Sequence, residues 1–302
     1  MISCFRMVHE GQISLQSFLL GLGILSYFLV TCGLWSPRLG VAEEWLQDHP
    51  WVYCGCFFAS VNAVLALAFR GKSWQIAVRG CFLGTACGLG VMVSVLCSSS
   101  YHVFGWYMVV LTLFHYSEYI TTAIGNPATL SLDSYLLNHS VAYGLAAVAS
   151  WVEFFIERHF LPEMKTLWYL STFGILVCLW GEIIRKAAML TAKTNFNHIV
   201  QTERQKDHEL VTWGAYSMFR HPSYVGWFWW SIGTQLILVN PICTIAYALA
   251  SWSFFYERIY FEEITLIKFF GEKYLDYQKK VGTGLPFIRG YQYVRRVRQE
   301  SE

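Results

Sequence analysis

The sequence predicts an all-α integral membrane protein with about eight transmembrane helices, of which the last two form a tight helical hairpin. Of the 302 residues, 55% are hydrophobic and only 14% are charged, whereas a soluble domain carries about 25% charged residues. The mean hydropathy is +0.38. Apolar segments follow one another along most of the chain, and most approach the roughly 20 residues that a helix needs to cross a bilayer.

Eight apolar segments are the candidate spans. In chain order they are 14–35, 51–69, 75–98, 102–123, 140–157, 166–184, 223–239 and 241–262. The first is long enough to span and has no small-residue cleavage site after a short core, which argues against a cleavable signal peptide. The fourth is the least typical because it carries two histidines and Glu118. Only Asn240-Pro241 separates the last two, and a proline that opens a helix is typical of a tight hairpin.

Basic residues set the predicted orientation through the positive-inside rule. The link 70–79, the end of the sixth segment and the C-terminal tail are basic, and they fall on one side if there are eight spans. The opposite loop 36–50 carries three acidic residues. The pattern predicts that both termini and the segment 185–222 lie in the cytosol.

The chain divides into two parts that differ in their polar residues. We interpret residues 1–165 as about five spans with short links and no charged cluster. Residues 166–302 supply three spans, a cytosolic loop at 191–222 and a C-terminal segment at 263–302, and they hold almost all residues that could do chemistry. The second part is therefore the predicted cytosolic catalytic region.

The cysteines and the glycines of the first part have simple interpretations. The nine cysteines include no CxxC pair, and Cys54-Gly55-Cys56 is too tight for the usual zinc spacing, so we expect no metal and nine small core hydrophobes. The net charge of +2 gives no indication of nucleic-acid binding. Several glycines lie inside apolar segments and follow no strand, which indicates close helix packing: Gly21, Gly23, Gly84, Gly88 and Gly90.

Ionisable residues at the edges of the apolar segments are the strongest functional signal, because they are costly at membrane depth. From Arg220 to Phe228 the chain reads Arg-His-Pro-Ser-Tyr-Val-Gly-Trp-Phe, where the polar segment 191–222 meets the segment 223–239. Pro222 fits the first turn of a helix, whose unpaired N–H groups favour a carboxylate. An interfacial anchor, with a snorkelling arginine and an aromatic belt, is the equal alternative.

A second charged cluster lies one hairpin later, and it contains Glu257, Arg258, Glu262 and Glu263. Arg258 and Glu262 are four residues apart and share one helix face, so a surface salt bridge is one interpretation. Four charges within seven positions exceed what a helix end needs. An arginine beside a pocket suits a two-pronged grip on a carboxylate, and a nearby glutamate suits ribose hydroxyls or an ammonium group.

Two further segments mix polar and aromatic residues. Residues 195–216 are typical either of a lid over a pocket or of an ordinary folded connector. Residues 269–277, Phe-Phe-Gly-Glu-Lys-Tyr-Leu-Asp-Tyr, read as a short amphipathic helix at the membrane surface. The aromatics of that helix either close a cofactor pocket or only contact the membrane.

Together these residues resemble the isoprenylcysteine carboxyl methyltransferase family. The resemblance rests on Arg-His-Pro-Ser-Tyr-Val-Gly, the hairpin, the Glu/Arg-rich helix end and Phe-Phe-Gly-Glu-x-Tyr-x-x-Tyr, and it runs from Asn195 to Gly290. The segment Thr-Gly-Leu-Pro-Phe-Ile at 283–288 and the eight-span count are also similar to that family, the latter to its animal members. The Arg-His-Pro motif alone is less specific, because sterol reductases and phospholipid methyltransferases also carry it.

The resemblance implies a multi-pass protein of the endoplasmic reticulum membrane with both termini and its active site in the cytosol. It implies methyl esterification of the C-terminal carboxylate of farnesylated or geranylgeranylated cysteine, on processed CaaX proteins such as small GTPases. The implied donor is S-adenosyl-L-methionine, and the product is S-adenosyl-L-homocysteine. Membrane lipid is a further partner, whereas nucleic acid and metal are not. Because an α-carboxylate with a reference pKa of about 3.5 is already ionised, in-line transfer needs no general base.

The resemblance also assigns roles to residues. Arg258 is the implied catalytic residue, which orients the substrate carboxylate. The implied cofactor-binding residues are Gln201, His208, Glu209, Leu210, Val211, Tyr216, His221, Pro222, Ser223, Tyr224 and Glu262. We expect the prenyl chain to enter sideways through an opening lined by apolar residues of the fifth to eighth spans.

Three other functions fit parts of the pattern. A phospholipid or amine N-methyltransferase would use the same donor pocket without a carboxylate clamp. A sterol reductase would bind NADPH instead. A transporter or channel fits less well, because the charges cluster at one boundary and no inverted repeat is evident in the sequence.

Overall fold

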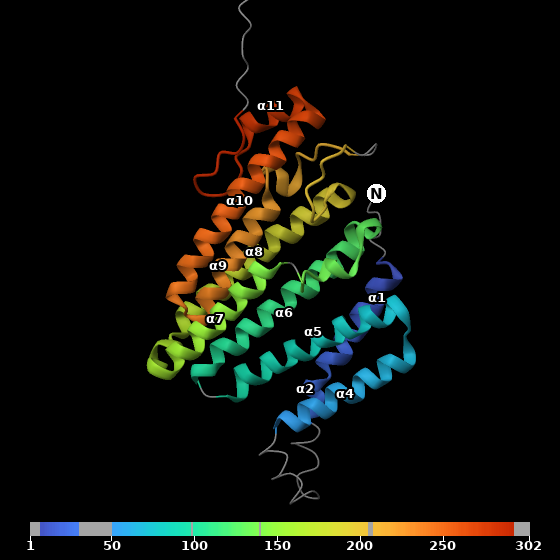
Figure 1. Cartoon of the computed structure of the whole chain (residues 1–302), viewed down its shortest axis with the longest axis vertical. Coiled ribbons are helices and arrows are strands. Elements are labelled where there is room, and N and C mark those ends of the chain that lie inside the picture. Colours follow the sequence, from blue (N-terminus) through green and yellow to red (C-terminus); the bar gives the residue numbers. More distant parts are fainter. Residues whose placement is uncertain (1–6, 30–49, 98, 139, 205–207, 293–302) are drawn as a thin grey trace, which may run out of the picture.

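The computed structural model describes residues 7–29, 50–97, 99–138, 140–204 and 208–292, and this part of the chain is helical without strands (Figure 1). The α-helices are α1 (His9–Leu22), α2 (Ile24–Leu29), α4 (Pro50–Ala68), α5 (Gly71–Leu96), α6 (Ser99–Gly125), α7 (Val141–Phe160), α8 (Trp168–Ala192), α9 (Pro222–Leu238), α10 (Pro241–Phe270) and α11 (Glu272–Lys280). Short 3-10 helices occupy several links: η2 (Pro127–Thr129), η3 (Leu132–Tyr135), η4 (Pro162–Thr166), η5 (Lys193–Asn195) and η6 (Gly214–Ser217).

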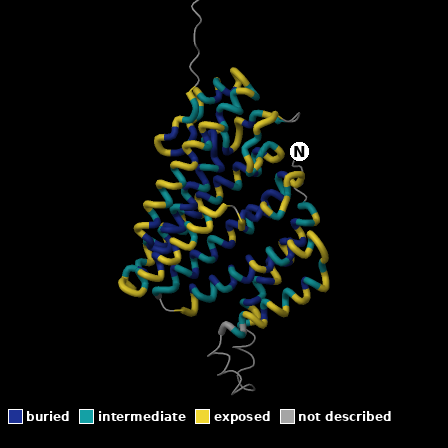
Figure 2. The backbone as a smooth tube through the Cα atoms, viewed as in Figure 1, coloured by how far each residue is buried: buried dark blue, intermediate teal, exposed yellow. Residues whose placement is uncertain are grey.

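Each of the eight apolar segments coincides with a helical stretch. The first segment covers the end of α1 and all of α2, and beyond residue 29 it lies outside the described residues. Two stretches of the described chain are by themselves long and apolar enough for a membrane span, His9–Phe28 and Gly71–Leu96. Eight spans therefore remain a prediction. Figure 2 shows the buried residues gathered between the helices, with exposed residues along their outer faces.

Glycines let α1 approach α5 very closely. A Cβ atom on Gly21 would lie 2.2 Å from the carbonyl oxygen of Cys81, and one on Gly84 would lie 2.0 Å from that of Phe18. Side chains larger than glycine would push the helices apart. Close packing also holds for Gly88 and Gly90, so the prediction is confirmed at these four positions. It is wrong for Gly23, which separates α1 from α2 and meets only its own preceding turn.

The cysteines are less uniformly buried than the sequence predicted. Cys81, Cys87, Cys178 and Cys243 are buried, which agrees with small core residues. Cys56 on α4 and Cys97, which follows the end of α5, are exposed, and for these two the interpretation is wrong. Cys4 and Cys32 lie outside the described residues.

The turn between α9 and α10 is held by side chains from η4 and from α7. Lys165 is fully buried, and its Nζ donates to the carbonyl oxygens of Leu238 at 3.0 Å and Val239 at 2.9 Å, which are unpaired at the end of α9. Glu153 accepts from the backbone N–H groups of Ile242 at 2.8 Å and Cys243 at 2.7 Å, at the positive end of α10. Charged residues before position 166 therefore have defined structural roles.

Candidate active site

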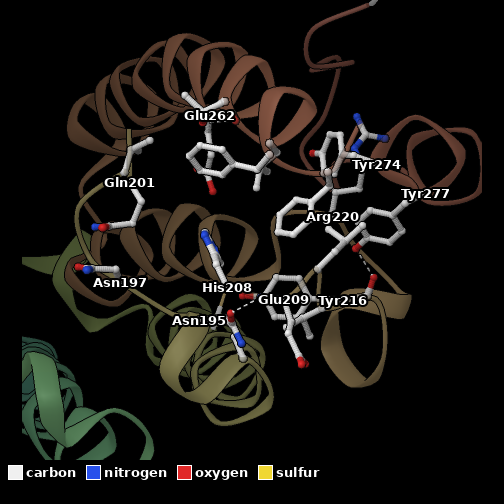
Figure 3. A pocket seen from close by; sticks show the side chains of 18 of the residues that line it. Asn195, Asn197, Gln201, His208, Glu209, Tyr216, Arg220, Glu262, Tyr274 and Tyr277 are labelled. Atoms are coloured by element: carbon white, nitrogen blue, oxygen red, sulfur yellow. Dashed lines mark hydrogen bonds between the residues drawn. The ribbon is translucent and has the colours of Figure 1, made fainter. Parts of the chain in front are cut away.

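A polar pocket lies where the end of α8, the loop 195–221, the last turns of α10 and α11 come together (Figure 3). Glu262 projects from α10 on one wall, and His208 from the loop lies on the opposite wall (Figure 3). Eight of the predicted cofactor-binding residues line this pocket: Gln201, His208, Glu209, Leu210, Val211, Tyr216, Tyr224 and Glu262.

A second pocket, which we call the junction pocket, adjoins the polar pocket. The two pockets share wall residues, including Asn195, Tyr216, Tyr224 and Glu262. The remaining predicted site residues line the junction pocket: His221, Pro222, Ser223 and Arg258. The structure thus brings all twelve predicted residues to two connected pockets, although their individual roles stay predictions.

An apolar cavity of about 540 Å³ continues from the junction pocket between the helices. Trp227, Phe254 and Phe255 line both spaces. Residues of α5, α6, α7, α9 and α10 form most of the wall of the cavity. Of the fifth to eighth spans, α7, α9 and α10 line this cavity, whereas α8 packs against α9 and does not. Helices α5 and α6 also line the cavity, which the sequence did not indicate, and the sideways opening stays a prediction.

Arg258 is held at two of its nitrogens. Its Nε donates to the hydroxyl oxygen of Tyr224 at 2.9 Å, and its Nη2 donates to the backbone carbonyl of His198 at 2.7 Å. The guanidinium also lies over the ring of Tyr224, 5.4 Å from the centroid. The Tyr224 hydroxyl donates in turn to the Glu262 carboxylate. Tyr224 therefore links the predicted substrate-side residue to the predicted cofactor-side residue, a connection that residue spacing alone could not reveal.

Glu263 has a different role from Glu262, although the two are adjacent. It is completely buried, and its Oε1 accepts from Nε of Arg220 at 2.8 Å. The other Arg220 nitrogens donate to carbonyls of the C-terminal segment, including that of Arg289 at 2.9 Å. Further donors surround the same carboxylate: His221, Tyr274, Gln278 and the N–H of Tyr291. Arg220 and Glu263 therefore fold the C-terminal segment onto α10, and Arg220 has few donors left for an anion.

The aromatic segment 269–277 supplies one wall of the polar pocket. Phe269, Phe270, Tyr274 and Tyr277 line it, which favours the alternative that these aromatics close a pocket, while its use by a cofactor stays a prediction. Burial raises the pKa of the hydroxyls of Tyr274 and Tyr277, so both remain donors at neutral pH. Tyr274 donates to Glu263 at 3.1 Å and Tyr277 donates to the carbonyl of Tyr216 at 2.5 Å.

His208, which lines the polar pocket, has a buried ring nitrogen without a hydrogen-bond partner among the described residues. Burial, and then the nearby Arg204 charge, lowers the pKa of His208, so the ring is neutral at pH 7. The ring lies 5.6 Å from the rings of Phe269 and of Phe270. Its buried Nδ1 has no hydrogen-bond partner among the described residues. A buried polar atom without a partner is unusual in proteins, and here it belongs to a residue that lines a pocket a polar ligand could fill.

Sequence reasoning missed a buried cluster around Glu118 of α6. The carboxylate accepts from Nε of Arg185 at 2.6 Å and from its Nη2 at 2.8 Å, and it also pairs with Lys186. His198 contacts the same carboxylate through Nε2 at 2.9 Å. Glu118 is the one member of this cluster from residues 1–165, so the first part of the chain contributes to a charged cluster whose other members belong to the second part. The sequence signal was Glu118 in the fourth apolar segment, which also carries two histidines.

Asn195 and Asn197 also line both pockets, although the resemblance did not assign them to the site. The side-chain oxygen of Asn195 accepts from the backbone N–H of Glu209 at 2.8 Å, which ties the start of the loop to its middle (Figure 3). Glu257, one residue before Arg258, is exposed and lines neither pocket. Within the described residues, no group of His, Cys, Asp and Glu side chains is arranged to hold a metal ion.

Comparison with known proteins gives consistent matches. The model of the isoprenylcysteine carboxyl methyltransferase (ICMT) family matches residues 174–268. The chain is 51% identical over 286 residues to a protein-S-isoprenylcysteine O-methyltransferase of Xenopus laevis, covering 94% of this chain and 97% of that protein. The Homo sapiens protein of the same name is 52% identical over 281 residues, covering 93% and 94%.

A solved structure of a eukaryotic intramembrane Ras methyltransferase, isoprenylcysteine carboxyl methyltransferase without a monobody, is also similar. Its TM-score to this chain is 0.85 at 47% identity. The match covers 94% of this chain and 99% of that one. Similarity of this extent includes the helices of both parts of the chain.

Proposed function

The chain belongs to the isoprenylcysteine carboxyl methyltransferase family, and from this membership we propose that it methylates the C-terminal carboxylate of prenylated cysteine with S-adenosyl-L-methionine as the donor. The chain is thus a membrane methyltransferase. The observation that carries the proposal is one continuous site, in which Arg258 stands between a polar pocket and an apolar cavity. A water-soluble donor and a lipid-modified acceptor need such opposite environments.

The residues of the polar pocket fit S-adenosylmethionine. The donor supplies a methyl group on a positively charged sulfur, and it carries ribose hydroxyls, an ammonium group and an aromatic base. Glu262 and Glu209 provide carboxylates for the cationic and hydroxyl groups, and the free Nδ1 of His208 is a polar partner. Phe269 and Phe270 provide aromatic surface for a base. We assign the donor to this pocket and to the eleven residues named from the resemblance.

Arg258 is suited to orient the acceptor carboxylate. Its Nε and Nη2 are bound to Tyr224 and to the carbonyl of His198, while Nη1 has no partner among the described residues. The carboxylate is ionised without a base, so the enzyme has only to align it with the donor and exclude water. Positioning of this kind can supply up to about 7–11 kcal/mol. A grip through few hydrogen bonds also avoids overstabilising the ground state.

The apolar cavity is the proposed place for the farnesyl or geranylgeranyl chain. Ala147→Trp would fill part of the cavity wall, so the KM for a prenylated cysteine should rise about tenfold while the KM for the donor is unchanged. Ala149→Trp is the matched control, because Ala149 is exposed on the same helix and does not line the cavity. Equal effects of both variants would contradict this use of the cavity.

Tyr224→Phe should affect both substrates. The change removes the hydroxyl between Arg258 and Glu262 but keeps the ring, which stacks on Phe255 at 5.0 Å. Because hydrogen bonds to charged groups contribute about 1.5–3 kcal/mol, kcat/KM for each substrate should fall at least tenfold. Tyr260→Phe on an exposed part of α10 is the control. A loss for one substrate alone would show that the hydroxyl does not connect the two sides.

We further propose eight spans in the endoplasmic reticulum membrane, with both termini and the polar pocket in the cytosol. The basic links and tail support this orientation. Proteins such as small GTPases, prenylated and processed at a CaaX end, are the proposed substrates. The division at residue 165 is a change in composition rather than in function, because α5, α6 and α7 line the apolar cavity.

The decisive assay uses purified full-length protein in lipid with labelled S-adenosylmethionine and N-acetyl-farnesylcysteine. Base-labile methyl ester should form, and the amide of the same substrate should give none. Donor binding without ester formation would move the acceptor to a lipid or an amine, as in the phospholipid methyltransferases. Binding of NADPH alone would overturn the proposal in favour of a reductase.

A further inference from the structure

We propose that Glu118 and His198 are positioning residues that set the orientation of Arg258, an inference that rests on the role proposed for Arg258 above. Glu118 lies on α6, Arg258 lies on α10, and His198 belongs to the loop between them in space. The first part of the chain would thus contribute to the reaction centre through a residue that touches neither substrate.

The base of this arrangement is rigid. Glu118 is 0% exposed, and Arg185 binds both of its oxygens, at 2.6 Å and 2.8 Å. Lys186 pairs with Glu118 and, at 3.3 Å, with Glu182 one turn away. Two carboxylates and two cations therefore balance in charge. Removing one member would leave a buried charge unpaired, which is strongly destabilising.

His198 connects this base to Arg258. Its ring Nε2 meets Glu118 Oε2 at 2.9 Å, while its backbone carbonyl accepts from Arg258 Nη2 at 2.7 Å. Tyr224 holds the guanidinium at Nε. Contacts at two different nitrogens fix the plane of the Arg258 guanidinium and leave its Nη1 directed away from both partners. Without the anchor on Glu118, the His198 loop would still reach Arg258 but would no longer hold one orientation.

Two other roles for these residues fit less well. His198 is not needed as a general base, because the acceptor carboxylate is already ionised and the Nε2 atom is engaged by Glu118. Arg185 also lines the junction pocket, but its Nε and Nη2 are bound to Glu118 and its Nη1 to Ser223 Oγ at 2.7 Å. Arg258 is the better free donor, and the Glu118 cluster is its support.

The test is His198→Ala in the full-length protein in lipid, because Glu118 variants endanger the fold. We expect kcat/KM for N-acetyl-farnesylcysteine to fall about tenfold, since a small misplacement of a positioning group is costly. The dissociation constants for S-adenosylmethionine and for the uncharged N-acetyl-farnesylcysteine amide should be unchanged, because the binding of neither ligand depends on the orientation of the guanidinium. His198→Gln should recover part of the loss by donating to Glu118. His159→Ala, at an exposed histidine on α7, is the control.

A double-mutant cycle with Arg258→Lys separates positioning from general damage. If His198 acts through the guanidinium, His198→Ala should cause no further loss in the Arg258→Lys background. Full additive loss there, or weaker binding of the amide, would overturn the inference while leaving the role of Arg258 intact. Normal activity of Arg258→Lys itself would instead overturn the proposed role of Arg258, and with it this inference.

Discussion

Arg258→Lys is expected to lower kcat/KM for a prenylated cysteine by about 100-fold or more. Lysine keeps the positive charge but has a single nitrogen. It cannot donate to the hydroxyl of Tyr224 and to the carbonyl of His198 and also present a separate nitrogen to the substrate carboxylate. The acceptor would therefore lose its alignment with the donor. Methyl ester formation under single-turnover conditions measures this effect directly.

Arg70→Lys is the matched control, because Arg70 is exposed in the link before α5 and far along the chain from the site. Donor binding to Arg258→Lys, measured by calorimetry, should change far less than kcat/KM, because Arg258 reaches the donor side only through the hydroxyl of Tyr224. Turnover near the normal rate would exclude a carboxylate clamp at this position. It would favour an acceptor without a carboxylate, such as a phospholipid amine.

Glu262→Ala is expected to raise the dissociation constant for S-adenosylmethionine roughly 10- to 100-fold, which corresponds to a charged hydrogen bond of about 1.5–3 kcal/mol. The side chain is 25% exposed on the pocket wall, and Tyr224 is its main protein partner, so it retains acceptor capacity for a cationic ligand. The dissociation constant of Glu262→Gln should lie between those of the unmodified protein and Glu262→Ala, because glutamine keeps an acceptor oxygen and loses the charge.

Glu257→Ala provides the comparison, since Glu257 lies on the same helix but is exposed and lines neither pocket. Its donor affinity should be unchanged. If Glu262→Ala also binds the donor normally, the donor does not contact this carboxylate. Glu262 would then act only by holding Tyr224.

The helices and the boundary residues could be predicted because both follow from local pattern. Apolar length marks the helices, and charge at their ends marks the region of the site. The twelve individual residues follow from the family resemblance, and all of them line the two pockets. Different roles for adjacent residues could not be read in the same way. Glu262 faces a pocket and Glu263 the C-terminal segment, because successive residues of a helix point about 100° apart.

The partners of Glu118 were beyond local reasoning. Arg185 is 67 residues away, and only the packing of α6 against α8 brings the two together. The same holds for the apolar cavity, where periodicity shows that a helix has an apolar face but not which neighbour covers it. The arrangement of helices decided that α5 and α6, rather than α8, form the wall.

In the proposed site, the hydroxyl of Tyr224 would link the binding of the two substrates thermodynamically. The hydroxyl accepts a hydrogen bond from Arg258 and donates one to Glu262, so a ligand that alters one of these contacts would alter the other. Whatever factor the methyl donor imposes on acceptor affinity, the acceptor must impose the same factor on donor affinity. The order in which the two substrates bind is then a matter of kinetics, and the ternary complex has one stability by either route.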